Sequence, residues 1–402
     1  MFLKKFSKIL GWILLIVLFL AACAPGEGQG GEQQKENPTS SEAIGNLLPA
    51  ENRQGRSGIC PSSVLDGYYI VSTRVSFHEA ATGTSMALCA QPGCVHMDET
   101  CQAWIGEVKS YTEYHGMIYA IRGNENIQFI QKSISNGNIE VLAEWKASDR
   151  VSYSASLNIV SDGMAVISLN SEISQGAGED FRIETIKSVW LYDLETSEMR
   201  ELLPTESERS VLALSRAHAV VLWYSDDQSV LTYEEFVAEY GSDRSYGNYL
   251  LRETNCELRL YNSDFDDYTV LTSTEQGFLP YSENNMTYGK ELVYVEGDKV
   301  FLVNIDTGEI RYLLSLNGII NYWFMDEKVF LIAREGDVLD PKAPISLWYA
   351  DVTDGVLVQM ENGGRTDYMV FSVGYEGQSF FLGTNGSFIS KTNFYAENYD
   401  AK

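Results

Sequence analysis

The sequence predicts an all-β protein: a β-propeller with one short helical insertion, for which seven blades are favoured over six or eight. Three observations support this fold class. From Cys60 onward, short runs rich in Val, Ile, Tyr and Phe alternate with Gly, Asp and Asn turns. A strand-and-turn unit returns at a spacing typical of four-stranded blades. Many runs are apolar at every position, as in sheets covered on both faces.

Composition limits the classes of partner. The chain has 402 residues and a formal net charge of −27, from 56 acidic and 29 basic side chains. Its 45 % of hydrophobic residues is typical of a folded protein. Nucleic acid is excluded as an expected partner because phosphate binding needs basic stripes. The acidic surface also repels anionic lipid headgroups, so membrane attachment would need another force.

The first residues predict an export signal. Lys4, Lys5 and Lys8 precede an almost unbroken apolar run at residues 9–20. That run is shorter than the roughly 20 residues that span a bilayer. A basic start followed by a short apolar run is the pattern of a secretory signal peptide, here residues 1–22.

The residues Leu20-Ala21-Ala22-Cys23 resemble the lipobox of bacterial lipoproteins. In that family a diacylglyceryl group is attached to the Cys sulfur, and a peptidase cuts just before it. The resemblance implies lipidation at Cys23 and a protein anchored to the extracytoplasmic face of the cell membrane. Several acyl chains would outweigh the acidic repulsion. An uncleaved anchor helix and an ordinary secretory signal are the alternatives.

Residues 23–58 predict a flexible tether between this anchor and the body. They are rich in Gly, Gln, Glu, Ser and Asn, and have hardly any aromatic or β-branched residues. The folded body is therefore expected at residues 59–402.

One stretch shows the repeating unit most clearly. Residues 291–296 and 299–304 are apolar runs separated by Gly297-Asp298, a two-residue hairpin signal. The next strand is expected at residues 309–314. The pattern predicts three consecutive antiparallel strands buried on both faces.

The same unit returns along the body and gives the blade number. At about 45 residues per blade, the body would hold seven to eight blades. A pair of β-sandwiches is the alternative, but sandwich strands usually have one solvated face. The units start near Asp66, Gly116, Asp162, Ala217, Lys290, Asp326 and Tyr375.

Residues 231–241 depart from this pattern and predict the helical insertion. Thr232 and Glu235 form a capping box, and Gly241 is a natural C-terminal stop. The helix could pack on the rim or cover one end of the central channel. A second polar stretch, residues 171–180, is expected to be a loop.

Four residues form a candidate metal site: Cys89, Cys94, His96 and Cys101. Between the first two, Pro92-Gly93 is a tight-turn pair that would fold them together. If the chain beyond the turn is extended, Cys94 and His96 point to the same side. Three thiolates and one imidazole suit a single structural zinc, because four protein ligands leave no open position.

Disulfides are the competing interpretation of this cluster, since exported proteins favour them. Cys60 could join such a pairing, whereas Cys256 is expected to be a buried thiol. The odd number of thiols left after Cys23, and the presence of His96, favour metal only slightly. The sequence therefore leaves zinc and disulfide both open.

No catalytic residue is predicted. The chain lacks a nucleophile elbow, a phosphate-binding loop, a dinucleotide fingerprint and a His-Glu-x-x-His pair. With 56 acidic residues, some carboxylate pair will always resemble a glycosidase couple.

Two motifs resemble those of bacterial lipoproteins with TolB-like propellers. One is the strand-and-turn unit best matched at residues 303–310, and the other is the Cys-Cys-His-Cys cluster from Cys89 to Cys101. TolB-like members act by binding partner proteins. The resemblance implies a binding or scaffold module for an envelope protein, peptide or glycan. The alternative is a propeller-fold polysaccharide hydrolase or lyase.

Overall fold

The computed structural model describes residues 59–175, 182–203, 209–224, 230–274, 287–361, 373–383 and 388–398. The chain divides into two units, Met1–Gly45 and Asn46–Lys402, and every described residue belongs to the second. The predicted signal peptide, the lipidation site Cys23 and the tether lie outside the described residues. No helix in the described part is long and apolar enough to cross a membrane.

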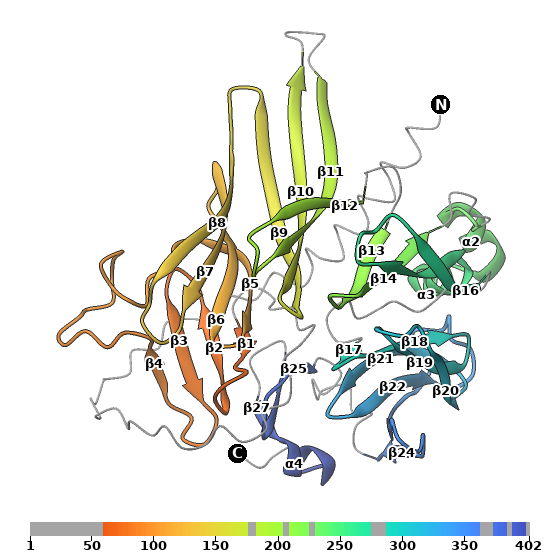
Figure 1. Cartoon of the computed structure of the whole chain (residues 1–402). Coiled ribbons are helices and arrows are strands. Elements are labelled where there is room, and N and C mark those ends of the chain that lie inside the picture. Colours follow the sequence, from red (N-terminus) through yellow and green to blue (C-terminus); the bar gives the residue numbers. More distant parts are fainter. Residues whose placement is uncertain are drawn as a thin grey trace. The chain divides into compact units, whose positions relative to one another are not determined.

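The strands form seven antiparallel sheets within the described residues, six of four strands and one of three (Figure 1). In every sheet each strand pairs with the next one along the chain. The prediction of an all-β protein is therefore confirmed. We number the sheets one to seven in chain order.

The first three sheets hold strands β1 to β12. The first sheet contains β1 (Ile59–Pro61), β2 (Gly67–Val71), β3 (Val75–Glu79) and β4 (Ser85–Ala87). The second contains β5 (Val108–Tyr114), β6 (Met117–Arg122), β7 (Asn126–Ser133) and β8 (Ile139–Lys146). The third contains β9 (Val151–Ser161), β10 (Met164–Gln175), β11 (Arg182–Asp193) and β12 (Met199–Leu203).

The remaining sheets hold β13 to β27. The fourth contains β13 (Arg209–Leu214), β14 (His218–Tyr224), β15 (Cys256–Asn262) and β16 (Tyr268–Thr274). The fifth contains β17 (Thr287–Tyr288), β18 (Glu291–Glu296), β19 (Lys299–Asn304) and β20 (Ile310–Ser315). The sixth contains β21 (Ile319–Met325), β22 (Lys328–Arg334), β23 (Ile345–Asp351) and β24 (Leu357–Met360). The seventh contains β25 (Val373–Glu376), β26 (Phe380–Gly383) and β27 (Phe388–Ser390).

The unit predicted from residue 291 onward is confirmed in its strands and turn. β18, β19 and β20 pair antiparallel, and Gly297 has a positive φ of 58° in the turn between the first two. β18 and β19 are buried on both faces, but most of β20 is exposed. The two-sided burial was wrong for β20, because the last strand lies at the sheet edge.

The predicted unit starts match the second strand of each sheet, with one exception. Six of them lie at or just before β2, β6, β10, β14, β18 and β22. The seventh, Tyr375, lies in β25, the first strand of its sheet. The repeat was visible because the second strand is the most completely apolar one, as in Phe330, Leu331 and their neighbours in β22.

Neighbouring sheets meet at the turns between their first and second strands. Hydrogen bonds at these turns join five of the seven neighbouring pairs of sheets, including the seventh sheet to the first. The hydrogen bonds are Ser63 Oγ to Glu113 Oε1 (2.6 Å), Gly163 N to Tyr114 Oη (3.1 Å), Arg216 N to Asp162 Oδ2 (2.8 Å), Asp326 N to Glu376 Oε2 (2.9 Å) and Ser379 Oγ to Asp66 Oδ2 (2.6 Å).

Apolar packing completes the series of contacts. The fourth, fifth and sixth sheets share one core, which includes Leu258, Val293 and Phe324. Tyr68 of the first sheet packs with Phe380 of the seventh. The contacts therefore run from sheet one through sheet seven and return to sheet one.

Because these turns share one end of the sheets, the loops between second and third strands lie at the other end. Strand direction alternates within each sheet, so a fourth strand ends at the same end as a second strand. The connections from one sheet to the next therefore lie at this other end too. We call this the connection end. It carries the Cys89–Cys101 loop after β4, the long hairpin of β10 and β11, a helical insertion after β14 and the loop of residues 335–344 after β22.

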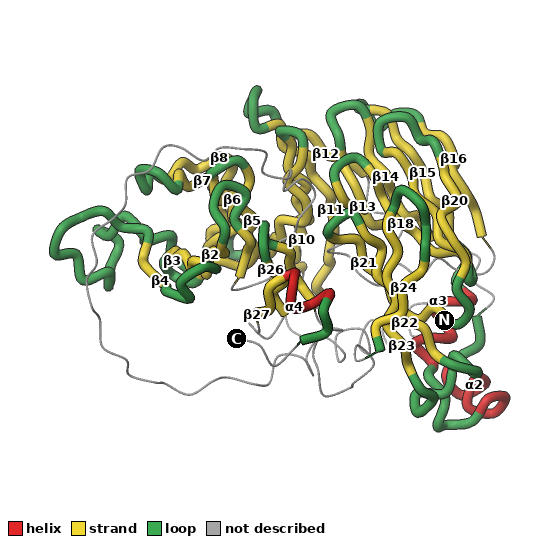
Figure 2. Tube along the Cα trace, turned by 90° about the horizontal axis from the view of Figure 1, so that it is seen from below, coloured by secondary structure: helices red, strands yellow, loops and turns green. Residues whose placement is uncertain are grey.

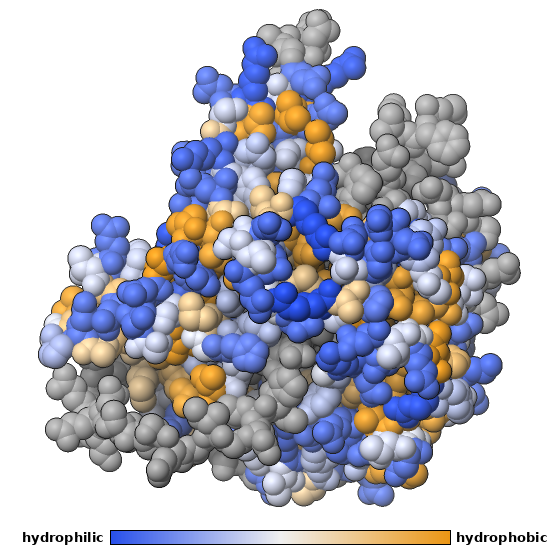
Figure 3. Space-filling model, in the orientation of Figure 1, coloured by the Kyte–Doolittle hydropathy of each residue, from blue (hydrophilic) through white to orange (hydrophobic). Residues whose placement is uncertain are grey.

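The long hairpin corrects one prediction. Residues 171–175, expected in a loop, belong to β10, and residues 176–180 lie outside the described part. β11 pairs with β12 only from Val189 to Tyr192, whereas β9 stays paired with β10 as far as Ile173, so the hairpin and β9 extend beyond the end of β12. The hairpin's polar residues hid the strand, because a protruding ribbon has little apolar surface to bury. Figure 3 shows apolar surface on this projection, where Ile183 and Ile186 are exposed.

The predicted helix is confirmed as α2 (Tyr233–Tyr240), with the capping box of Thr232 and Glu235 and its end at Gly241. Two short helices were not predicted, α3 (Tyr246–Glu253) and α4 (Lys391–Tyr395).

The α2–α3 insertion packs on the sixth sheet's loop, near β22 and β23 (Figure 2). Ser245 N donates to Leu339 O at 2.8 Å, and Arg244 pairs with Asp340 at 3.2 Å. These contacts fix the insertion on the loop that follows β22.

Candidate metal centre

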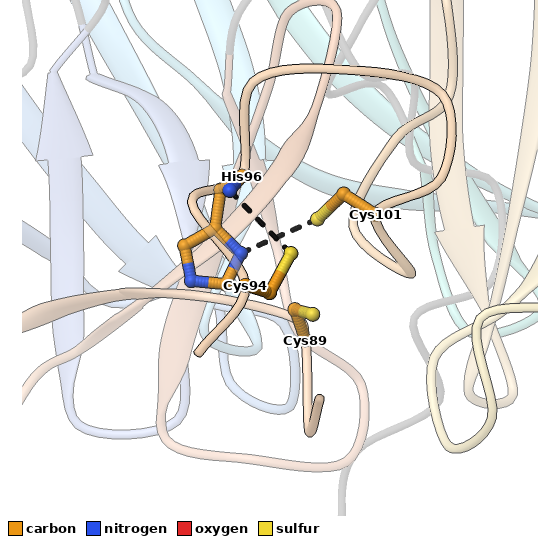
Figure 4. A group of neighbouring side chains, drawn as sticks. All are labelled: Cys89, Cys94, His96 and Cys101. Carbon is orange, nitrogen blue, oxygen red and sulfur yellow. Dashed lines mark hydrogen bonds between the residues drawn. The ribbon is translucent and has the colours of Figure 1, made fainter. Parts of the chain in front are cut away.

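The connection from β4 to β5 brings the four predicted ligands together. One ligand atom from each of Cys89, Cys94, His96 and Cys101 lies within 4.8 Å of the others (Figure 4). Cys101 is buried and the other three are partly buried. In the part of the chain that the structure describes, this is the one group of this kind.

The first turn of the loop is the predicted one. Cys94 N donates to Gln91 O at 3.3 Å, and Gly93 has a φ of 73°. Pro at the second position and a left-handed Gly at the third define a type II turn. The turn reverses the chain, so that Cys94 comes to lie beside Cys89.

The route beyond this turn differs from the expectation. His96 is not in an extended segment but has a φ of 55°, the left-handed region that His tolerates better than most residues. His96 N donates to Cys94 Sγ at 3.4 Å, and His96 Nδ1 lies 3.3 Å from Cys101 Sγ. Arg74 Nη1 holds the bend by donating to His96 O at 3.1 Å. A tight bend, not strand alternation, points the imidazole at the sulfurs.

A second reversal returns Cys101 to the cluster. Cys101 N donates to Asp98 O at 3.1 Å, while the Asp98 carboxylate accepts from Thr100. Ala103 N then donates to Cys101 Sγ at 3.3 Å. Backbone N–H groups aimed at a sulfur favour the thiolate form that binds metal.

The far end of the loop is fixed to the first sheet. Val75 N donates to Ala103 O at 2.8 Å, and Ile105 N donates to Thr73 O at 2.9 Å. Ile105 is fully buried. The ligands therefore stand on a rigid base.

The thiols are electrostatically unequal. Burial raises the pKa of Cys101 to about 11. Burial also opposes ionisation of Cys89, but hydrogen bonds from the backbone at Gln91 and Gln102 and from the thiols of Cys94 and Cys101 outweigh it and lower the pKa of Cys89. A bound cation would favour all three thiolates.

The donor set fits a metal such as zinc. Tetrahedral zinc with bonds of about 2.0 to 2.3 Å needs ligand atoms roughly 3.3 to 3.8 Å apart. The 3.3 Å between His96 Nδ1 and Cys101 Sγ lies in this range, and all four ligand atoms lie within 4.8 Å of one another. Cys89, Cys94 and Cys101 form no disulfide. Of the two interpretations left open by the sequence, the arrangement favours metal, and the identity of the metal follows only from the ligand chemistry.

The other Cys and His residues lie elsewhere. Cys60 Sγ accepts from Glu113 N at 3.2 Å, and Cys256 is buried in the core of the fourth to sixth sheets. His78 bonds to Ser85, and His115 lies in a turn.

Two supporting residues were not predicted. Lys132 on β7 is 1 % exposed, and its Nζ donates to Gln102 O at 2.6 Å and to Gly137 O at 2.7 Å. Gln102 Oε1 accepts from Ala90 N at 2.9 Å and so joins the two ends of the loop. Burial lowers the pKa of Lys132 to about 8. The available signal was a Lys at an inward position of a strand whose other buried residues, Ile127, Phe129 and Ile130, are apolar.

Comparison with known proteins adds remote likenesses only. No protein-family model and no curated protein matches the chain. Among solved structures, an oligogalacturonate lyase from Vibrio parahaemolyticus is 8 % identical with a TM-score of 0.42, covering 78 % of this chain and 79 % of that one. Porphyromonas gingivalis dipeptidyl peptidase 4 is 11 % identical with a TM-score of 0.41, over 73 % of this chain.

Acylaminoacyl peptidase from Pyrococcus horikoshii gives 12 % identity and a TM-score of 0.42, over 77 % of this chain. The matched part spans less than half of each peptidase, 42 % and 46 % of their lengths. Likenesses at this level do not bear on the activity of this chain.

Proposed function

We propose that the chain is an extracytoplasmic lipoprotein whose body is a seven-bladed β-propeller acting as a binding or scaffold module. Residues 1–22 would be removed, Cys23 would carry the lipid, and residues 23–58 would tether the body, residues 59–402, to the membrane. The ligand class is an envelope protein, peptide or glycan. The basis for the anchor is the lipobox sequence Leu20-Ala21-Ala22-Cys23.

The propeller proposal is supported by sheet order. Successive antiparallel meanders, six of four described strands and a last one of three, contact one another in chain order, and the bond between Ser379 and Asp66 joins the last to the first. A closed series of such sheets is the construction of a propeller.

One observation carries the binding role: the metal-site loop displays apolar side chains to solvent. Val95 and Met97, on either side of His96, are each 73 % exposed. Exposed apolar groups on a loop fixed by a rigid base are typical of binding surfaces. The proposed zinc would be structural, because all four positions are protein ligands. Its part is to hold this loop in place.

The test compares two surface variants for partners retained from detergent-solubilised membranes. The double variant Val95→Ser with Met97→Ser should lose the envelope component that the wild type retains. Val358→Ser, an exposed Val on β24, is the matched control and should retain it. Equal retention by both variants would contradict the binding role. Release of unsaturated or reducing ends from polysaccharide would favour the hydrolase or lyase alternative instead.

Two further measurements test the anchor and the metal. Cys23→Ser should move the protein from the detergent phase to the aqueous phase, because the acceptor sulfur is lost. Protein purified without a His-tag should contain one zinc, and Cys94→Ser should lose it. Absence of metal in the wild type, with fewer than five reactive thiols in the denatured, unreduced mature protein, would reject the metal interpretation and favour a disulfide.

A further inference from the structure

We propose that Lys132 is a positioning residue of the metal centre, where its buried ammonium both fixes the Cys101 segment and offsets the negative charge of the metal-bound thiolates. This inference rests on the proposed metal binding by Cys89, Cys94, His96 and Cys101.

The first observation is the place of the ammonium group. Lys132 belongs to the second sheet, yet its Nζ reaches the metal-site loop and donates to Gln102 O at 2.6 Å. Its other acceptor is Gly137 O at 2.7 Å, in the turn between β7 and β8. The ammonium therefore clamps the residue that follows Cys101 against a neighbouring turn.

The turn is shaped for this close approach. Gly137 has a φ of 74°, and a Cβ there would lie 2.8 Å from Gln102 O. Any larger residue would push the carbonyl away from Lys132. Gln102 also binds Ala90 N, next to Cys89, so displacing Gln102 would move two of the four ligands.

The second observation is the missing counter-charge. In the described part of the chain no carboxylate forms an ion pair with Lys132, and its two acceptors are neutral carbonyls. A buried cation without an anionic partner is costly by several kcal/mol. The acceptor Gln102 directly follows the ligand Cys101, so a metal-bound thiolate at Cys101 would supply the missing negative charge close to Lys132.

The charges then balance when metal is bound. Three thiolates, one neutral imidazole and one divalent cation leave a single negative charge, which the Lys132 ammonium offsets. Partners outside the ligand set tune metal affinity in this way, and their loss typically costs about 10- to 100-fold.

The experiment measures metal affinity in the full chain purified in detergent. Zn²⁺ would be titrated against a chromophoric chelator in the wild type, Lys132→Met and Lys132→Gln. The Gln variant keeps an amide donor for the two carbonyls but removes the charge. We expect both variants to bind Zn²⁺ about 10- to 100-fold more weakly. Thermal unfolding would show whether each variant is folded. If Lys132→Met does not fold, the Zn²⁺ affinity of Lys132→Gln decides the test.

A matched control and a spectroscopic readout separate the outcomes. Lys391→Met removes another largely buried ammonium, at the start of α4 and away from the metal-site loop, and should leave Zn²⁺ affinity unchanged. The Co²⁺ spectrum of each variant should keep the thiolate charge-transfer bands, which show that the ligand set is intact. If the wild type binds no metal, the proposed metal centre fails. If it binds metal and Lys132→Gln binds within threefold of it, the role of Lys132 is refuted.

Discussion

Residues with a left-handed backbone conformation shape many turns of the molecule, and Gly318 is one that no larger residue can replace without a clash. It has a φ of 77°, and its N–H donates to Asp298 Oδ1 at 3.0 Å. A Cβ at Gly318 would lie 2.3 Å from the carbonyl oxygen of Arg334. Both the backbone conformation and the space therefore require Gly.

Gly318→Ala should lower the free energy of unfolding by about 3 kcal/mol, since left-handed strain of about 1 to 2 kcal/mol adds to the clash. Gly336→Ala measures the left-handed strain without the clash, because Gly336 has a φ of 79° and a Cβ there would have no atom within 4 Å. Urea unfolding would measure both. Equal losses would show that Arg334 moves aside at no cost.

A buried carboxyl gives a pH-dependent prediction. Glu113 is almost fully buried, and burial raises its pKa although Ser63 and Gly116 donate to it. The folded state thus binds this proton more tightly than the unfolded state. Its stabilising contribution is present below the usual Glu pKa and lost as pH rises through the raised value.

Glu113→Gln should remove this part of the pH dependence. Unfolding free energies measured by urea from pH 4 upward would fall less steeply in the variant than in the wild type. Glu198→Gln, on an exposed turn, serves as the control and should follow the wild type. A variant profile as steep as the wild-type profile would assign the dependence to other groups.

At the metal site the sequence predicted the ligands but not the path between them. Pro92-Gly93 identified the first turn because its chemistry is local. The bend at His96 was missed, since a left-handed His depends on Arg74 and on the sulfurs around it. Lys132 was missed because its partners are backbone carbonyls, which no side-chain pattern reports.

At the scale of elements, α4 joins the sixth and seventh sheets through ion pairs, a hydrogen bond and aromatic packing. Lys391 Nζ contacts Glu376 Oε1 at 2.6 Å and Asp326 Oδ1 at 2.8 Å. Tyr395 Oη donates to Asp326 Oδ2 at 2.6 Å. Phe394 is fully buried among the aromatic rings of these sheets. A helix of five residues is stable here because of these contacts and not through its own propensity.

Lys391→Met should destabilise the protein by about 3 kcal/mol, because Glu376, only 3 % exposed, would lose its counter-ion. Lys146→Met breaks an ion pair with Glu144 whose Lys is largely exposed, and should cost little. Differential scanning calorimetry would compare the two. Similar losses of stability in the two variants would contradict the stabilising role of Lys391 between the sixth and seventh sheets.

Strands and helices were predictable from sequence to different extents. α2 was predictable because its capping box consists of two residues close together in the sequence, Thr232 and Glu235. α3 and α4 were missed because they are short and are fixed by contacts with distant loops. The bases of β10 and β11 were predictable from their apolar runs. The sequence instead predicts a loop for residues 171–175, the outer part of β10, because their Ser and Glu residues show no apolar alternation.

For the whole molecule, the order of sheets was predictable but their closure was not. The repeat of second strands follows from the chain alone, whereas the contact of Asp66 with Ser379 joins residues 313 positions apart. Backbone and side chain of Ser379 both donate to this carboxylate. Closure makes every sheet depend on two neighbours, which favours cooperative unfolding.

A double-mutant cycle of Asp66→Ala and Ser379→Ala should give a coupling energy of about 1 kcal/mol, the usual value for a hydrogen bond to a charged group near the surface. The pair Asp66→Ala and Ser315→Ala shares no hydrogen bond and should be additive. Equilibrium unfolding in urea would supply the free energies. Additivity in the first pair would mean that the first and last sheets do not meet in solution.

The turns between first and second strands lie at one end of the sheets, and the connections between sheets lie at the other. This separation has an evolutionary consequence. Turns at one end must keep their length, because most of them bond to a neighbouring sheet. The connection end already holds a long hairpin, a two-helix insertion and the Cys89–Cys101 loop, and none of these interrupts the bonds between sheets. Descendants of a common ancestor should therefore differ in length at this end and agree at the other. New binding properties can be acquired there by insertion while the scaffold is inherited unchanged.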